Sequence, residues 1–234
     1  MSFTIGADPE LGIRLNGSHA HARRFFKANS SFGLDGNDST AELRPGYSES
    51  PIDLTAKIRT ILEYGHSKHP ELEFISGHMV DDYTVGGHVH IGVAPNDTII
   101  ANLDTVLGAL SDCIDDLEQR EKRRNYGYGR KGAYRRKSYG FEYRVPGSWL
   151  LSPSITLVTL TLAKLTVLNE NIDYDKFNRF DNPQEFLRRF KNITPTIPSD
   201  CQEGLLELQI LLNSDRPNWN VNILPNWGLG GLAA

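Results

Sequence analysis

The sequence predicts an α+β fold with a mainly antiparallel sheet, and three observations support this prediction. Short strand-like stretches fill the first half of the chain, an Asn-Gly pair suited to a tight hairpin turn follows one of them, and helical patterns with capping residues are interleaved. With 234 residues, 39% of them hydrophobic, the chain can bury a core. We therefore predict a single domain over residues 1–234, with a helical part over residues 150–234.

The first predicted strands lie at the N-terminus. Residues 3–5 and 11–15 are predicted as two short strands, and Asn16 and Gly17 supply the left-handed residues of a turn. Pro9 lies between the two strands and lacks a backbone donor, so we expect an edge strand or a bend there. Further strands or apolar runs of strand length cover residues 40–44, 71–75, 88–93 and 139–145.

Capping residues mark where the helices begin. Ser50, Asn96 and Ser152 each precede a helical stripe of apolar residues. We expect the second of these helices to end near Arg123. Two more helical patterns cover residues 183–190 and 202–212.

Charge is spread unevenly along the chain. The net charge is −4, but residues 120–137 hold nine Lys or Arg against one Glu. A basic segment in an acidic protein favours a specific anionic ligand over a general polyanion surface. Because residues 124–140 are rich in glycine, arginine and tyrosine, we expect them to form a loop.

The cysteines and the apolar segments favour a reducing, aqueous compartment. Cys113 and Cys201 lie among apolar residues without Cys-x-x-Cys spacing, so we expect buried, reduced thiols. The first ten residues lack the basic and apolar regions of a signal peptide. The apolar stretch at residues 155–168 is too short to cross a bilayer. We therefore expect a soluble, cytoplasmic protein.

Two histidines lie one residue apart among glycines and β-branched residues. His88 and His90 are expected on the same face of a strand, where both can reach one metal ion or one phosphate. Neighbouring glycines let a ligand approach the backbone closely. A lone histidine on a strand is more often structural, but this pair favours a functional role.

Three more pairs repeat this spacing: Asp8 with Glu10, Glu42 with Arg44, and Glu142 with Arg144. Carboxylates are ligands that Mg²⁺ prefers, and arginine binds a carboxylate or phosphoryl group bidentately. Each Glu-x-Arg pair can also be an exposed ion pair of little energetic weight. The four pairs together favour divalent metal binding and phosphoryl transfer.

The basic segment has three interpretations. Basic residues among tyrosines can bind nucleic acid, can cradle a nucleoside triphosphate over an active site, or can simply be solvated. The adjacent Glu142 and Arg144 favour a nucleotide over nucleic acid. The residues that we expect to bind it are Arg130, Lys131, Arg135 and Arg136.

Four motifs, in their order and spacing, resemble carboxylate-amine ligases of the glutamine synthetase and glutamate-cysteine ligase group, particularly phage and bacterial amidoligases. They are Gly6-Ala-Asp-Pro-Glu10, Thr40-Ala-Glu-Leu-Arg-Pro45, Gly86-Gly-His-Val-His90 and Tyr134-Arg-Arg-Lys-Ser-Tyr-Gly-Phe-Glu-Tyr-Arg-Val-Pro146, all within residues 6–149. The resemblance implies a curved antiparallel sheet like the glutamine synthetase catalytic domain, with helices on its outer face. ATP and the other substrates would enter from opposite ends. Beyond residue 150 only a helix matches.

The resemblance also implies roles for the matched residues. His90 would lie near the transferred phosphate, Arg144 would bind the substrate or the acyl phosphate, and we group Arg44 with them as catalytic. ATP and Mg²⁺, or Mn²⁺ in its place, would be the cofactors, and a phage-encoded protein would act in the host cytoplasm. The implied metal ligands are Asp8, Glu10, Glu42, His88 and Glu142. Asp8 is one methylene shorter than the glutamate usual in glutamine synthetases.

The predicted function is an ATP- and Mg²⁺-dependent ligase that joins a carboxylate to an amine through an acyl phosphate. Expected substrates are amino acids, peptides or a related metabolite; nucleic acid and membranes are not expected partners. One alternative is a metal-dependent hydrolase that uses His88, His90 and the carboxylates around a water. Another is a nucleic-acid-binding protein that uses residues 120–137. A kinase-like phosphotransferase would share the first half-reaction.

Overall fold

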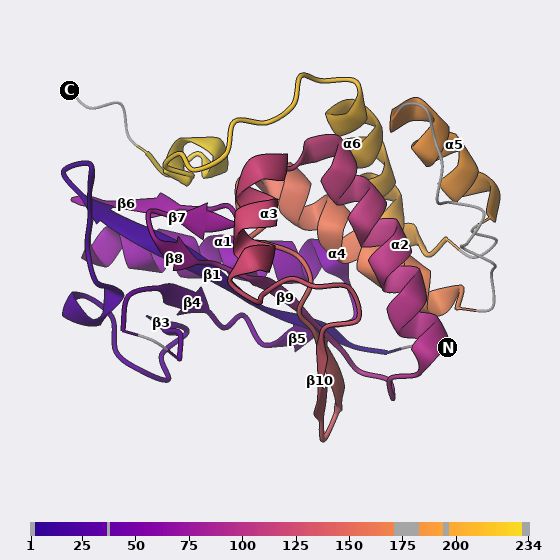
Figure 1. Cartoon of the computed structure of the whole chain (residues 1–234), viewed down its shortest axis with the longest axis horizontal. Coiled ribbons are helices and arrows are strands. Elements are labelled where there is room, and N and C mark those ends of the chain that lie inside the picture. Colours follow the sequence, from indigo (N-terminus) through magenta and orange to yellow (C-terminus); the bar gives the residue numbers. More distant parts are fainter. Residues whose placement is uncertain (1–2, 37, 171–182, 194–196, 231–234) are drawn as a thin grey trace.

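The sheet is organised around one long central strand. The structure is a computed structural model that describes residues 3–36, 38–170, 183–193 and 197–230 (Figure 1). Strand β1 (Ile5–Leu15) is flanked near its start by β5 (Tyr47–Ser48) and β9 (Gly87–Ile91). Its end is flanked by β2 (Ser18–His19) and β6 (Leu72–Ile75).

The longest path through the sheet runs β10-β11-β9-β1-β4-β3. It adds β10 (Tyr134–Lys137), β11 (Gly140–Tyr143), β4 (Ala41–Leu43) and β3 (Phe32–Leu34). A separate pair joins β7 (Met79–Val80) to β8 (Tyr83–Thr84). Every strand pair among the described residues is antiparallel, which confirms the predicted sheet type.

Pro9 lies in the middle of the central strand, so the predictions of an edge strand there and of two short strands around it were wrong. The missing backbone donor of Pro9 costs no hydrogen bond of the sheet. The backbone N–H of the next residue, Glu10, points toward β9 and donates to the Gly86 carbonyl (2.8 Å). Adjacent N–H groups point to opposite sides of a strand. The nitrogen of Pro9 therefore faces the gap between β4 and β5, where β1 has no strand partner.

The predicted helices begin at their capping residues. Ser50, Asn96 and Ser152 accept hydrogen bonds from the backbone of the first turns. These three caps are therefore confirmed. The helices are α1 (Pro51–Lys68), α2 (Asp97–Ile114), α3 (Leu117–Asn125), α4 (Pro153–Leu168), α5 (Pro183–Ile193) and α6 (Gln202–Leu212).

The second helix is shorter than predicted, because α2 ends at Ile114 and does not continue toward Arg123. Asp115 has an extended backbone, and its carboxylate accepts a hydrogen bond from buried His78 (2.8 Å). Asp116 then caps α3 by accepting from the backbone of Gln119 (3.1 Å). Two adjacent aspartates therefore break the helix, although the apolar stripe continues across them.

The predicted loop at residues 124–140 was also partly wrong, because its second half contains β10. This strand pairs with β11 and places Arg135 opposite Glu142 and Arg136 opposite Phe141. The hairpin projects from the rest of the chain in Figure 1. Both faces of β10 carry basic residues, so the apolar alternation that marks a strand is missing.

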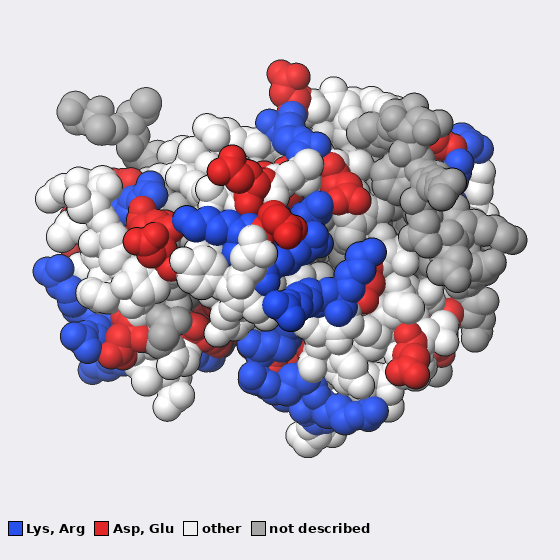
Figure 2. Space-filling view, viewed as in Figure 1, with Lys and Arg blue, Asp and Glu red and all other residues white. Residues whose placement is uncertain are grey.

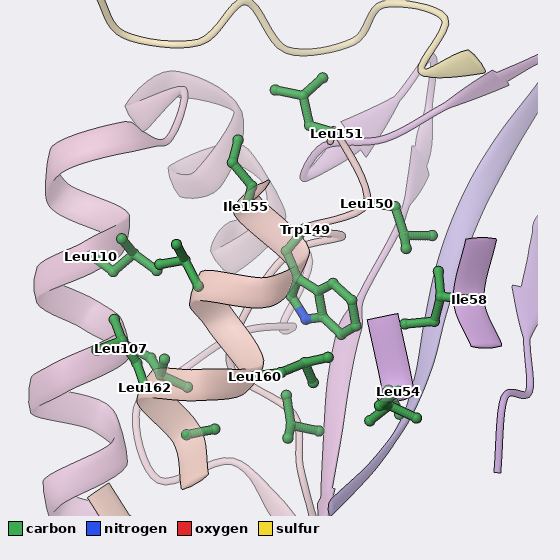
Figure 3. Close-up of a cluster of buried hydrophobic side chains, with 14 of the residues drawn as sticks. Leu54, Ile58, Leu107, Leu110, Trp149, Leu150, Leu151, Ile155, Leu160 and Leu162 are labelled. Carbon is green, nitrogen blue, oxygen red and sulfur yellow. The ribbon is translucent and has the colours of Figure 1, made fainter. Parts of the chain in front are cut away.

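Helices α1, α2, α4 and α6 pack together over one face of the sheet, where α1 contacts β1, β3 and β5. One apolar cluster extends along the chain from Phe3 to Trp227. In Figure 3, Trp149 lies between Leu54 of α1 and Leu107 of α2. Its indole N–H donates to the Gly87 carbonyl of β9 (2.8 Å), which ties this cluster to the sheet. The opposite face of the sheet carries polar side chains.

Neither cysteine forms a disulfide. Cys201 is buried and Cys113 is half-buried. Burial raises the pKa of Cys113 to about 11 and that of Cys201 to about 12, so both thiols are protonated at neutral pH. Among the described residues, we find no helix with the length and hydropathy needed to span a membrane.

Candidate active site

Strand alternation separates the core from a polar face. Along β1, Ala7 and Leu11 are buried in the core, while Asp8 and Glu10 point to the opposite face. The same alternation holds in β4, β9 and β11. The ionisable residues that it places together are Asp8, Glu10, Glu42, His88, His90 and Glu142.

Strand register brings these residues side by side. Asp8 is directly opposite His88, and Glu10 is directly opposite Glu42. His90 in turn is opposite Glu142. Motifs that are far apart in the sequence therefore meet on four neighbouring strands.

Asp8 lies at the centre of this group. Its Oδ2 is 3.0 Å from His90 Nε2, and its Oδ1 is 3.3 Å from His88 Nδ1. Burial alone would raise the pKa of Asp8, but the two imidazoles outweigh it and hold that pKa well below its usual range. Asp8 is therefore ionised at neutral pH.

Glu142 is almost fully buried and is surrounded by cations. Its Oε2 lies 2.7 Å from Lys137 Nζ and 3.7 Å from Arg135 Nη1, and its Oε1 pairs with Arg144. Burial raises the pKa of Glu142, but the nearby cations, Lys137 and Arg144 among them, lower it by more than this. The net shift of the pKa is therefore downward. This carboxylate is also ionised.

Glu42 and Glu10 behave differently. Burial and the charge of Asp8 raise the pKa of Glu42 to about 8, although Arg44 Nε lies 2.9 Å from its Oε1. Arg44 also donates to the backbone carbonyl of Leu34 (2.6 Å), so its guanidinium is fixed. Burial raises the pKa of Glu10 to about 7. Crowded carboxylates with raised pKa values indicate a site suited to additional positive charge.

Tyr139 orients one of the histidines. Its hydroxyl lies 2.9 Å from His90 Nδ1, and the two rings are stacked with their centroids 5.7 Å apart. The other ring nitrogen, Nε2, faces Asp8. A hydrogen bond at one nitrogen sets the orientation of the other, as is usual for metal-binding histidines.

Two cavities meet at Asp8 and Glu42. We call the first the tyrosine chamber; it measures about 650 Å³ and its lining includes Tyr47, Arg44, His90, Lys137 and Tyr139. We call the second the arginine chamber; it measures about 450 Å³ and its lining includes Glu10, His88, Arg123, Arg135, Glu142 and Arg144. Lys and Arg side chains gather over α3, the loop after it and β10 (Figure 2). Both chambers are large enough for a small molecule.

The donor set fits a divalent cation. Asp8, His90 and Glu142 each offer a ligand atom, and these atoms lie within 4.8 Å of one another. The atoms Asp8 Oδ1, His90 Nε2 and Glu142 Oε2 are buried, and apart from the ion-pair contacts given above they make no hydrogen bond with any described residue. Two carboxylates and an imidazole suit Mg²⁺ or Mn²⁺.

One known family matches most of the chain. The sequence profile of the family described as phage phiEco32-like COOH.NH2 ligase-type 2 matches residues 5–187. The chain belongs to this family. Its matched region extends beyond residue 149, where the sequence motifs end, and includes every predicted site residue. A search of curated proteins found no match.

Nine of the twelve residues predicted for this COOH.NH2 ligase site line one or both chambers. They are Asp8, Glu10, Glu42, Arg44, His88, His90, Arg135, Glu142 and Arg144. Arg130, Lys131 and Arg136 line neither chamber, and their nucleotide contacts stay a prediction. We expected His88 to bind the metal and His90 to lie near the phosphate, whereas the three-ligand group contains His90.

Sequence reasoning missed three residues of the site. Lys137 follows Arg135 by two residues and would have been found once residues 134–137 were assigned to a strand. Tyr139 follows in the turn of the same hairpin. Arg123 gives no sequence signal, because an arginine near the end of a charged helix is usually exposed, whereas this one is buried.

Proposed function

We propose that this COOH.NH2 ligase is ATP- and Mg²⁺-dependent and forms an amide through an acyl phosphate. The observation that carries the proposal is the meeting of two chambers at Asp8 and Glu42. Two substrates that must exchange a phosphoryl group can each fill one chamber and react where the chambers join.

The nucleotide is assigned to the tyrosine chamber. Tyr47 and Tyr139 offer aromatic faces for the base, and Lys137 offers a cation for a phosphate. Asp8, His90 and Glu142 would hold Mg²⁺ at the inner end of this chamber. The ion neutralises charge on the triphosphate and on the transferred phosphoryl group.

The carboxylate substrate is assigned to the arginine chamber. Arg144 and Arg135 lie on the wall nearest to Glu142 and can bind the carboxylate or the acyl phosphate. Arg44 approaches the junction from the tyrosine chamber. These fixed cations offset the repulsion between two anionic reactants.

The reaction has two steps. An oxygen of the substrate carboxylate attacks the γ-phosphorus of ATP, the bond to the β-γ bridging oxygen breaks, and ADP leaves. The amine nitrogen then attacks the acyl carbon, the carbon-oxygen bond breaks, and inorganic phosphate leaves as the amine proton is lost to water. No side-chain nucleophile is required.

Phosphate release tests this proposal. The protein is incubated with ATP, Mg²⁺ and pooled amino acids and amines, and each component is then omitted in turn. Release is expected only when ATP, Mg²⁺ and an acid are all present, and mass spectrometry should find an amide when an amine is added.

Two variants, one at the site and one control on the surface, extend this test. Glu142→Gln removes a buried metal ligand and should lower the rate by about 100-fold or more. Glu118→Gln changes an exposed carboxylate on α3 and should leave the rate unchanged. Product formation without ATP, which a hydrolase would give, or full activity of Glu142→Gln would contradict the proposal.

A further inference from the structure

Three exposed cations lie outside both chambers, and we call them the outer cations. Arg130, Lys131 and Arg136 line neither chamber, and the reaction steps above do not use them. None of the three forms an ion pair with a described residue. The exposed carboxylates of the neighbouring helix α3 are Glu118 and Glu121, and Glu121 pairs with another arginine of α3 (3.6 Å). Lys and Arg side chains therefore gather on this part of the surface (Figure 2).

Two carboxylates near the outer cations are occupied by other contacts. Asp104 accepts hydrogen bonds from the backbone N–H of Gly132 (2.7 Å) and from the Tyr143 hydroxyl (2.7 Å). Burial raises the pKa of Asp104, and Lys131 opposes that shift from beyond ion-pair distance. Glu142 is buried and pairs with cations of the candidate active site. The outer cations are therefore available to an anion from outside the chain.

The loop between α3 and β10, which carries two of these cations, has a well-defined backbone. Gly127 and Gly132 adopt φ angles of +89° and +78°, which glycine reaches without strain. The backbone N–H of Ala133 donates to the Arg130 carbonyl (3.1 Å), and that of Arg144 donates to the Ala133 carbonyl (2.9 Å). A loop that is already ordered loses little conformational freedom when a partner binds.

Two exposed tyrosines come just before the outer cations in the chain. Tyr126 is 57% exposed and Tyr128 is 50% exposed, and neither ring packs against another aromatic ring of the described residues. Tyr128 also borders the arginine chamber, whereas Tyr126 lines neither chamber. Exposed aromatic faces can stack on nucleic-acid bases while nearby cations contact the phosphates. An acidic peptide would use the cations but would leave the aromatic faces without a role.

We propose that the outer cations and Tyr126 bind single-stranded nucleic acid on the surface of the basic segment. The bases of a duplex are stacked inside it, so only a single strand offers free base faces to a tyrosine. RNA and DNA share the phosphates and the bases, and the test below separates them. This inference goes beyond the ligase reaction and does not depend on it. It departs from the sequence-based expectation that nucleic acid is not a partner, because the outer cations lie outside both chambers.

Fluorescence anisotropy tests the proposal with labelled oligo(dT) and oligo(U) of about 20 nucleotides, longer than a typical single-strand site. A duplex of the same length and polyglutamate are the competing polyanions. The wild-type protein should bind at least one single strand with a Kd of about 1–100 μM near physiological salt, more tightly than either competitor. Saturating ATP with Mg²⁺ should not displace the strand. Absence of binding to both strands, equal affinity for the duplex or for polyglutamate, or displacement by ATP would overturn the proposal.

Two triple variants locate the contacts. Arg130→Gln, Lys131→Gln and Arg136→Gln, combined in one protein, should lower the affinity by about 10-fold or more. The slope of log K against log salt should become shallower by about 2, because each phosphate contact to a single strand contributes about 0.7. The control variant removes three exposed cations elsewhere, Lys27→Gln, Arg59→Gln and Lys68→Gln. Both variants change the net charge equally, so an equal loss in the two, or full affinity in the first, would overturn the proposal.

Tyr126→Ala tests the stacking contact separately. Its affinity should fall by about 5- to 150-fold, the range for loss of one stacked base. Tyr64→Ala is the matched control, because Tyr64 is 56% exposed and lies on α1. It should bind like the wild-type protein. Unchanged affinity of Tyr126→Ala would refute the role of this ring, and the proposal with it. Amide formation is measured apart from these assays, so either proposal can fail alone.

Discussion

At the scale of single residues, the site depends on how each ligand atom is oriented. Asp8 lies between His88 and His90 and borders both chambers. Its ionisation follows from the two imidazoles rather than from solvent. The side chains that touch Asp8 are therefore expected to set metal affinity as much as the carboxylate itself.

Tyr139→Phe tests this orientation. The variant removes the hydroxyl that lies 2.9 Å from His90 Nδ1 but keeps the aromatic ring. We expect Mn²⁺ affinity to fall by about 10-fold, as is typical when a hydrogen-bond partner of a metal ligand is lost. Calorimetric titration with Mn²⁺ measures the change.

The matched control is Tyr126→Phe, which changes a tyrosine that is 57% exposed and lines neither chamber. It should bind Mn²⁺ like the wild-type protein. Unchanged affinity of Tyr139→Phe would show that His90 is not held by this hydroxyl.

At the scale of elements, alternation along the strands explains what the sequence could predict. Two residues with one residue between them, such as His88 and His90, lie on the same face of a strand whatever the rest of the fold is. Each pair could therefore be recognised from the sequence alone. Strand register could not be predicted, because it depends on which strands pair. The prediction failed where local signals conflict with context, as at Pro9 in the central strand and in β10, which lacks apolar alternation.

Gly87→Ala tests whether β9 needs close packing to position its histidines. An added Cβ would lie 2.2 Å from the Gly147 carbonyl and 2.5 Å from Nε1 of Trp149, so the strand would have to move. We expect the free energy of unfolding to fall by roughly 1–3 kcal/mol, together with Mn²⁺ affinity. Urea denaturation and calorimetry measure the two effects.

Gly108→Ala is the control for this substitution. Gly108 lies within α2, and a Cβ there would meet nothing within 4 Å. Its stability should be unchanged or higher by about 0.5–1 kcal/mol, because alanine favours a helix. If Gly87→Ala behaves in the same way, the packing of β9 does not constrain the site.

At the scale of the whole molecule, hydrogen bonds join the C-terminal segment to residues far away in the chain. Trp227 donates to the Leu150 carbonyl (2.7 Å) and Trp219 to the Ile114 carbonyl (2.8 Å). The motifs within residues 6–149 indicated the family, but the sequence alone could not place Arg123. Its burial depends on loops that carry Gly86 and Gly129, which lie far apart in the chain.

The most direct test of the account is a crystal structure of the protein with Mg²⁺ and a non-hydrolysable ATP analogue. We expect Mg²⁺ about 2.1 Å from oxygens of Asp8 and Glu142 and bound to phosphate oxygens, with the nucleotide in the tyrosine chamber. A nucleotide bound elsewhere, or an ion that touches neither carboxylate, would contradict it.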